Sequence, residues 1–228
     1  MKGVNIIATF VTACKVRLYH IRQFIRNCIY YYLWNPKFFC ADMLCLFQYF
    51  WQSPFRMIRR HDEKNPDNPL GPYGETDFYL FDTLLHRFRI SRDLTFAELG
   101  SGRSRLAMWL AMVRGQAKVY AVEQYGPMVE RAKRVKRWLG VKNVEFVQAN
   151  WEELAFSDVD LFYLYLPVES DDQLREVGKT TCRLKSGTRI ITIGWWFGEV
   201  MPEKFMLEGK TKIRFDWGPT EAYLQTIL

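Results

Sequence analysis

Three absences in this 228-residue chain narrow its chemistry before any motif is considered. Histidine is scarce, and His20, His61 and His86 are scattered along the chain. The five cysteines form no pair at metal-ligand spacing with histidine partners, so we expect free thiols in a reducing compartment. Every long apolar run is interrupted by a charge such as Asp42 before it reaches the roughly 18 residues of a membrane-spanning helix. Neither a metal centre nor a membrane span is expected.

Acidic residues are almost missing from the first 60 positions. That region holds nine lysines and arginines against the single acid Asp42, a net charge of +8, whereas the rest of the chain carries −1. Apolar residues recur there at helical spacing, at Leu18, Ile21, Ile25, Cys28, Ile29 and Tyr32. This pattern predicts a basic amphipathic helix. Such a helix can lie in an anionic membrane interface, or it can pack on the domain beside it, and the sequence leaves both interpretations open.

A third glycine is missing from the turn that organises the rest of the chain. Residues 94–99 are a short apolar stretch that predicts a strand, Gly100 and Gly102 allow a tight turn, and a helix is expected over 103–113. The dinucleotide fingerprint Gly-x-Gly-x-x-Gly would need its last glycine at Arg105. The nicotinamide and flavin interpretation is therefore weakened.

Two carboxylates flank this turn. Glu98 stands just before Gly100 and can pair with a cationic group of a ligand, which favours a nucleotide that bears an amino acid. Glu123 ends the next strand, 118–122, and follows Gly102 by 21 residues, near the offset of about 20 at which an acid holds ribose hydroxyls. The turn and the two acids therefore predict a nucleoside site at the carboxyl end of a parallel sheet.

The remaining pattern alternates strands with helices. Further strands are expected at 144–148, 160–164 and 189–193, a closing antiparallel hairpin at 212–217 and 222–228, and helices at 77–89 and 126–139. Arg131, Lys133, Arg134, Lys136 and Arg137 lie on the second of these helices. This run is most simply a solvated face, with a nucleic-acid or acidic-protein surface as the alternative.

The glycine turn with its two acids resembles motif I and the following acid of class I S-adenosylmethionine (SAM) methyltransferases. The resemblance implies a doubly wound, Rossmann-like, seven-stranded α/β sheet over residues 72–228 and SAM as the cofactor. It also implies cofactor contacts from Glu98, Gly100, Ser101, Gly102, Glu123 and Gln124. Asn150 and Trp151 would serve the adenine, although many relatives have aspartate where this chain has Asn150.

A second resemblance concerns the segment before the turn. The loop Tyr73, Gly74, Glu75 and Thr76 resembles the non-SET histone lysine methyltransferases of the disruptor-of-silencing type, which implies that it closes over SAM. Tyr165-Leu166-Pro167, at the end of the fourth strand, departs from that family. It resembles the ATP synthase c-subunit type of lysine methyltransferase, which shares a membrane-associated N-terminus. The implied substrate is a protein lysine.

Methyl transfer from a sulfonium needs positioning more than acid–base machinery. A lysine must nevertheless arrive neutral, and a desolvated aromatic channel lowers its pKa. We expect Tyr165, Pro167, Trp195 and Trp196 at that channel. A small-molecule or lipid methyltransferase and a non-catalytic SAM-binding module are the alternatives.

These inferences divide the chain into a basic, aromatic-rich helical region (1–60), a linker (61–71) with Pro66 and Pro69, and the methyltransferase domain (72–228). A weak signal-like stretch follows Lys2, but a SAM enzyme belongs where SAM is made. We therefore expect a cytoplasmic protein, peripheral at a membrane. Removal of residues 1–60 is expected to abolish liposome binding and to spare SAM affinity.

Overall fold

A computed structural model describes residues 6–67, 69–71, 73–150, 156–168, 170–215 and 218–228. Its α-helices are α1 (Ile6–Asn27), α2 (Pro36–Phe47), α3 (Pro54–Lys64), α4 (Phe78–Arg87), α5 (Arg105–Trp109), α6 (Gly126–Leu139) and α7 (Asp171–Thr181). Its strands are β1 (Thr95–Leu99), β2 (Lys118–Glu123), β3 (Val144–Gln148), β4 (Leu161–Leu164), β5 (Arg189–Ile193), β6 (Phe205–Phe215) and β7 (Gly218–Ile227). The short helices η1 (Cys28–Tyr32) and η2 (Leu110–Arg114) have π geometry, and η4 (Phe197–Glu199) is a 3₁₀ turn.

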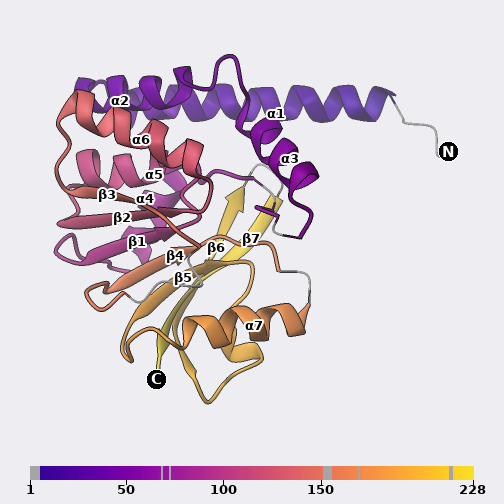
Figure 1. Cartoon of the computed structure of the whole chain (residues 1–228), viewed down its shortest axis with the longest axis vertical. Helices are drawn as coiled ribbons and strands as arrows, with labels where there is room; N and C mark the ends of the chain where they lie inside the picture. The colour runs from indigo at the N-terminus through magenta and orange to yellow at the C-terminus, as the bar shows by residue number, and fades with distance from the viewer. Residues whose placement is uncertain (1–5, 68, 72, 151–155, 169, 216–217) are drawn as a thin grey trace.

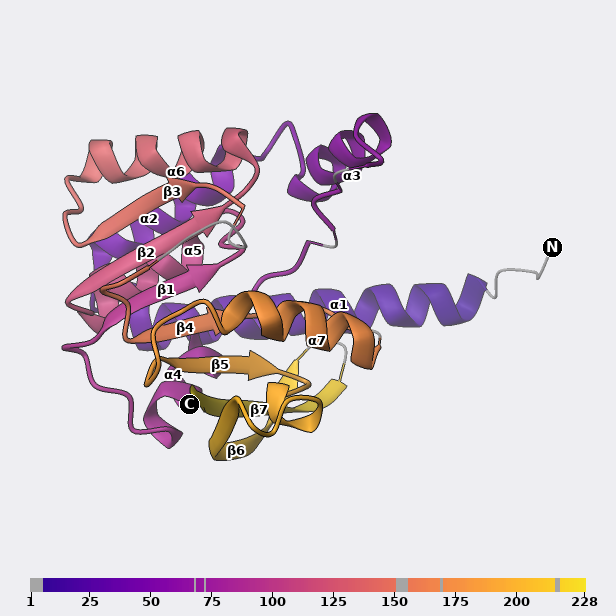
Figure 2. The ribbon, with the colours of Figure 1, turned by 60° about the horizontal axis from the view of Figure 1, so that its bottom comes forward.

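The strands form one sheet in the order β3-β2-β1-β4-β5-β7-β6. Strands β1 to β5 are parallel, and β7 runs antiparallel to both of its neighbours. Figure 1 shows α5 and α6 on one side of this sheet and α7 on the other, and Figure 2 shows the same arrangement after rotation. The strand order reverses between β1 and β4, so the carboxyl ends of these strands open a crevice. The predicted doubly wound, seven-stranded α/β fold is confirmed.

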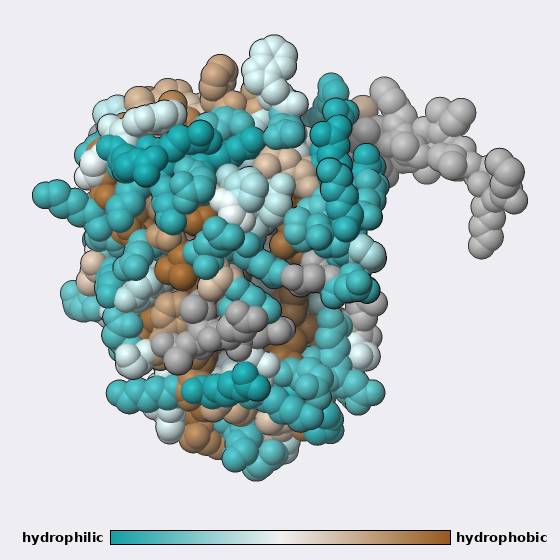
Figure 3. Space-filling view, in the orientation of Figure 1, coloured by the Kyte–Doolittle hydropathy of each residue, from teal (hydrophilic) through white to brown (hydrophobic). Residues whose placement is uncertain are grey.

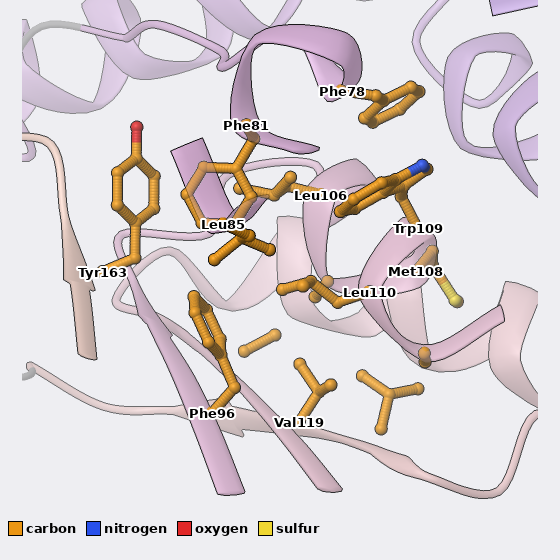
Figure 4. Close-up of a cluster of buried hydrophobic side chains, with 14 of the residues drawn as sticks. Phe78, Phe81, Leu85, Phe96, Leu106, Met108, Trp109, Leu110, Val119 and Tyr163 are labelled. Carbon is orange, nitrogen blue, oxygen red and sulfur yellow. The ribbon is translucent and has the colours of Figure 1, made fainter. Parts of the chain in front are cut away.

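Each face of the sheet has its own hydrophobic core, because alternate side chains of a strand point to opposite faces. On β1, Phe96 packs with α4, α5 and α6, whereas Ala97 packs on the α7 side. Figure 4 shows part of the first core, where the rings of Phe78 and Trp109 stack and the Tyr163 hydroxyl points away from the sheet. The sheet is therefore buried on both sides, as parallel sheets usually are.

Local signals set the helix ends near the predicted positions. Asp77 caps α4 by accepting a hydrogen bond from the Leu80 N–H at 2.8 Å. Gly140 ends α6 with a φ of 59°, as expected for a left-handed C-terminal glycine. The helix expected over 103–113 begins only at Arg105, because the turn continues through Ser104 at a φ of 58°.

Other boundaries differ from the prediction by more residues. The linker expected at 61–71 begins with the second half of α3, which starts with Pro54 after Ser53 and buries Met57 and Ile58. Its polar residues are the solvated face of an amphipathic helix. Strand β6 begins at Phe205, seven residues before the predicted start, and residues 216 and 217 of the expected hairpin lie outside the described part.

The N-terminal helices are built into the domain. Tyr31 and Tyr32 of η1 and Phe38, Ala41 and Cys45 of α2 are buried in the same core as α4 and α5. Helix α1 leaves this core and runs past the edge of the domain (Figures 1 and 2). In the described part of the chain, no helix has the length and hydropathy needed to cross a bilayer.

The apolar stripe predicted on α1 does not face the domain. Leu18, Ile21, Ile25 and Ile29 are each more than half exposed, while Tyr32 at the end of the stripe is buried. Neighbouring exposed aromatics include Trp34, Phe47, Phe50 and Trp51. The interpretation in which this stripe packs on the domain is therefore wrong for these four exposed residues, whereas Cys28 and Tyr32 do pack on the core.

The face seen in Figure 3 is mostly hydrophilic over α3 and α6, with hydrophobic side chains visible in a hollow between them and the lower half of the molecule. The arginines and lysines of α6 contribute to this hydrophilic surface: Arg134 and Arg137 are exposed, as a solvated helix face requires. Lys133 pairs with Glu130 on the same helix at 3.2 Å.

Candidate active site

A cavity of about 340 Å³ lies at the carboxyl ends of β1, β2 and β4, where the strand order reverses. Its volume falls in the range typical of small-molecule sites, roughly 300–1,000 Å³. Twelve of the sequence-predicted site residues line it: Tyr73, Gly74, Glu75, Thr76, Glu98, Gly100, Ser101, Gly102, Glu123, Gln124, Tyr165 and Pro167. The sheet topology thus brings together the predicted turn, the loop before it and the end of β4.

The glycine turn is held by the neighbouring strand. The N–H groups of Gly100 and Ser101 both donate to the Val122 carbonyl, at 3.0 and 2.8 Å. Gly100 and Gly102 have φ values of 75° and 52°, which glycine adopts without the penalty that a side chain brings. Ser104 adopts a φ of 58° although it is not glycine, and its hydroxyl lies 3.1 Å from that of Ser101. Local strain in such a turn is typical of a functional site.

Glu98 is the most unusual group in the cavity. Its side chain is buried, and the Ala107 backbone N–H donates to its carboxylate. The Oε2 atom is buried and has no hydrogen-bond partner among the described residues. Burial, followed by repulsion from Glu75 and Glu123, raises the pKa of Glu98 well above its usual value. A cation placed in the cavity would relieve both the unpaired oxygen and the repulsion.

Glu123 is anchored by backbone groups. Its Oε2 accepts from the Gly102 N–H and its Oε1 from the Tyr125 N–H, both at 2.8 Å. Burial raises its pKa in spite of these hydrogen bonds. Each carboxylate oxygen has a second lone pair, so the group can still accept from a pair of ribose hydroxyls. Glu123 therefore has a second role that the sequence did not show, which is to fix the glycine turn.

The loop of residues 73–76 covers the turn from above. A methyl group at Gly102 would lie 2.9 Å from Cε2 of Tyr73, so the tyrosine ring rests directly on the glycine. The Tyr73 hydroxyl donates to Glu75, and Arg103 donates to both Glu75 oxygens at 2.5 and 2.6 Å. Glu75 lines the cavity, as predicted, and its ion pairs also hold the loop in place.

These ion pairs continue into the N-terminal region. Arg105 donates to Glu75 at 2.8 Å and, through two nitrogens, to Asp42 of α2 at 2.6 and 2.8 Å. The Tyr32 hydroxyl also donates to Asp42, whose side chain is fully buried. Burial opposes the charge of Glu75, but Arg105 and Arg103 outweigh it and lower its pKa to about 2. Helix α2 is thus tied to the cavity through Arg105.

At the other end of the cavity, hydroxyl and aromatic groups surround the end of β4. Thr76 and Tyr163 share a hydrogen bond of 2.6 Å between their hydroxyls. Tyr165 stacks on Phe215 of β6, with ring centroids 5.2 Å apart, and Pro167 lies beside it on the cavity wall. Burial raises the pKa of Tyr163, so this hydroxyl stays protonated. This end is suited to an apolar or weakly polar reacting group.

Four predicted site residues lie elsewhere. Trp195 is buried in the core on the α7 side, where its indole N–H donates to the Leu166 carbonyl at 2.8 Å, so its predicted place in the channel was wrong. Trp196 lies against Gly198 and does not line the cavity. Asn150 is partly buried and is not among the lining residues. Trp151 is outside the described residues.

Sequence reasoning missed several contributors. Ile58 of α3 and Leu70 close one side of the cavity, although both were assigned to the region outside the domain. Tyr163 precedes the motif noticed at 165–167 and points to the opposite face from Phe162. Its alternation with Phe162 along a buried strand was the available signal. Arg105 was noted only as a missing glycine.

The chain shares sequence and fold with known methyltransferases. The family described as "Methyltransferase domain" matches residues 90–186, which include the turn, both acids and the end of β4. The fold is that of a class I methyltransferase. This agrees with SAM as the expected cofactor of such a domain. No curated protein matches the sequence.

Solved methyltransferase structures superpose at low identity. An RNA methyltransferase from Salinibacter ruber, in complex with S-adenosyl-L-homocysteine, gives a TM-score of 0.54 at 23% identity over 68% of this chain and 94% of that one. TrmN from Thermus thermophilus gives a TM-score of 0.56 at 15% identity, over 68% of this chain and 50% of TrmN. The B. subtilis M1A22 tRNA methyltransferase TrmK gives a TM-score of 0.51 at 15% identity, over 62% of this chain and 64% of TrmK. The chain thus spans about half of TrmN, and these likenesses establish the fold.

Proposed function

We propose that this protein is a SAM-dependent methyltransferase that acts on a lysine side chain of a protein. The observation that carries the cofactor assignment is the Glu98 carboxylate, which has an unpartnered buried oxygen in a cavity at the switch point of the sheet. SAM carries an ammonium and a sulfonium group, so it would supply the cation that this carboxylate lacks. Gly100 and Gly102 leave room for close approach of the ligand to the backbone.

The residues present fit the cofactor. Glu123 can hold ribose hydroxyls while it keeps its bonds to the backbone, and the 73–76 loop closes the side above the turn. The bound cofactor supplies an activated methyl group. Tyr165, Pro167 and Leu166 line the cavity at the end of β4, where they would position the acceptor and keep water out.

A protein acceptor fits the charges around the site better than RNA does. Among the described residues that line this cavity or the larger cavity beside it, the lysine and arginine side chains are those of Arg103 and Arg105. Arg103 is paired with Glu75, and Arg105 with Glu75 and Asp42. Phosphate binding needs cations that are not already neutralised. The aromatic end of the cavity instead favours a lysine that loses its proton on desolvation.

RNA is the second candidate, because solved structures with the same fold include RNA and tRNA methyltransferases. The exposed basic residues of α6 are the surface that would bind it. A small-molecule or lipid acceptor is the further alternative. The three differ in which fraction of a labelled extract receives the methyl group.

Calorimetry and labelling test the proposal in two steps. The wild-type chain should bind SAM, and a Glu98→Ala variant should lose at least tenfold in affinity. The wild-type protein is then incubated with tritiated SAM and a detergent-solubilised extract. The label should appear in the protein fraction and should remain there after ribonuclease treatment and solvent extraction. Absence of SAM binding would refute the enzyme. Label found only in RNA or in the organic phase would refute the lysine acceptor.

We also propose that residues 1–60 rest on an anionic membrane surface of the cytoplasm. The exposed apolar stripe of α1 and the +8 charge of this region support this location. An Ile21→Asn/Ile25→Asn variant should sediment less with phosphatidylserine vesicles than the wild type. Equal sedimentation of both proteins would remove the membrane proposal.

A further inference from the structure

A second, larger cavity of about 670 Å³ lies beside the first and shares its wall. Tyr73, Gly74, Glu75, Thr76, Arg105 and Tyr165 line both cavities. The far wall of the second cavity is helix α1, and its floor includes Phe78 and Phe215. Figure 1 shows the ends of β6 and β7 reaching toward α1. We call this space the α1 groove.

Helix α1 turns one consistent face to the α1 groove. Its lining residues, Val16, Tyr19, His20, Gln23, Phe24 and Asn27, recur at intervals of three and four, which places them on one side of a helix. At about 100° per residue this side is roughly opposite to the outer stripe of Leu18, Ile21 and Ile25. The helix therefore has an apolar outer face and a mixed polar and aromatic inner face. One faces outward, and the other borders the site.

The α1 groove combines aromatic surface with polar side chains, among them His20, Gln23 and Thr76. Tyr19, Phe24, Phe55, Phe78 and Phe215 supply aromatic surface, and Phe24 and Phe55 remain substantially exposed. The two arginines of its wall are neutralised by carboxylates. Asn27 is buried, and its Oδ1 has no hydrogen-bond partner among the described residues. A hydrogen-bond donor entering beside α1 would satisfy that oxygen.

We infer that the α1 groove holds the acceptor, and that its occupant is a protein segment with apolar side chains flanking the target lysine. This inference rests on the proposed function and names the class of its substrate. An apolar segment covers the aromatic walls, and its peptide N–H groups supply donors that an acyl chain lacks. The neutralised arginines leave no place for a phosphate backbone. The shared wall at Tyr165 and Thr76 is where the lysine enters the cofactor cavity.

Two adjacent residues of α1 provide a matched pair of variants. Phe24 lines the α1 groove and is 49% exposed, whereas Ile25 belongs to the outer stripe and is 52% exposed. Phe24→Asn and Ile25→Asn therefore remove similar exposed apolar surface from the two faces of one helix. Asparagine adds no charge that could attract the ammonium group of lysine. Phe24 also contacts the ring of the core residue Tyr32, with ring centroids 6.1 Å apart, so unchanged SAM affinity is the check that this part of the core stays intact.

The experiment compares the full-length wild type with both variants in detergent micelles, where no bilayer contributes. Calorimetry measures SAM affinity, and tritiated SAM with increasing amounts of solubilised protein extract measures methylation. SAM affinity should stay within twofold in all three. The extract concentration for half-maximal labelling should rise at least tenfold for Phe24→Asn and stay within twofold for Ile25→Asn. Mass spectrometry should find apolar residues beside the methylated lysine.

The outcomes separate this inference from the proposed function. If protein labelling changes equally in the two variants, the α1 groove is not the acceptor site. The same holds if charged residues flank the methylated lysines. Either result would leave the proposed lysine methyltransferase intact. Labelling of RNA or lipid in place of protein would refute the proposed lysine acceptor and, with it, the apolar protein segment. Failure of the wild type to bind SAM would instead refute the proposed function itself.

Discussion

Glu98 is a single carboxylate that lowers the stability of the free protein and prepares it for a cation. Because its folded pKa lies above its ordinary 4.5, the folded state holds a proton that the unfolded state releases. The free energy of unfolding therefore decreases as pH rises from 4.5 toward the folded pKa. The same burial makes the group responsive to a positively charged ligand.

A Glu98→Gln variant should therefore be more stable than the wild type when ligand-free. Its advantage in melting temperature should grow from pH 5 to pH 8, by about 2–4 °C for each 1 kcal/mol. Its SAM affinity should fall at least tenfold, because the amide does not pair with a cation. Thermal scans at both pH values and calorimetry measure these effects. Glu145→Gln, at an exposed position of β3, is the control that should change neither.

The Tyr73 ring packs directly on Gly102. Gly102→Ala should lower SAM affinity about tenfold, because the new methyl group would lie 2.9 Å from the ring and displace the loop. Gly187→Ala shares the positive φ but meets no atom within 4 Å. Both variants should lose about 1–2 kcal/mol of stability from backbone strain. Calorimetric affinity that falls equally in both would contradict a specific role for the Tyr73 contact.

At the scale of elements, the contact between α2 and α5 holds the 73–76 loop. Asp42 pairs with Arg105, and Arg105 in turn pairs with Glu75, so an acid outside the predicted domain orients a loop of the cavity. Within this network the depressed pKa of Glu75 stabilises the folded state above pH 4.5. That contribution is lost as pH falls from 4.5 toward 2.

Asp42→Asn should destabilise the protein by on the order of 3 kcal/mol, since it removes the charge that neutralises a largely buried arginine. SAM affinity should also fall, because Asp42 no longer orients the Arg105 guanidinium that binds Glu75. Denaturant unfolding and calorimetry measure the two effects. Glu63→Gln breaks only an exposed pair with Arg59 and should cost less than about 1 kcal/mol. An Asp42→Asn variant as stable as Glu63→Gln would show that the network does not support the loop.

For the whole molecule, the N-terminal region is part of the folded unit. Deletion of residues 1–60 would remove Tyr31, Tyr32, Phe38 and Cys45 from the core and Ile58 from the cavity wall. Each buried large side chain contributes about 1.5–3 kcal/mol, and a typical domain has only about 5–15 kcal/mol in total. The truncated chain should therefore show no cooperative thermal transition. This reverses the expectation that truncation spares SAM affinity. If the truncated chain unfolds cooperatively and keeps its SAM affinity, the original expectation would be correct.

The outer stripe of α1 shows how far pattern reasoning reaches. Its spacing correctly predicted a helix. The same spacing, however, fits a helix face that packs on protein and one that lies in a membrane interface. The choice between them depends on where the neighbouring helices lie. The described part of the chain leaves the stripe exposed and turns the opposite face of α1 to the site.

The sequence alone determined the sheet, the glycine turn and the two acids, because strand alternation, helix caps and glycine conformations are local properties of neighbouring residues. The tertiary structure decided what surrounds them. It placed Ile58 on the cavity wall, linked Asp42 to the cavity through Arg105, moved Trp195 into a core, and brought α1, Tyr165 and Phe215 to one groove. These relations join residues distant in the chain, and they follow from how side chains pack in three dimensions.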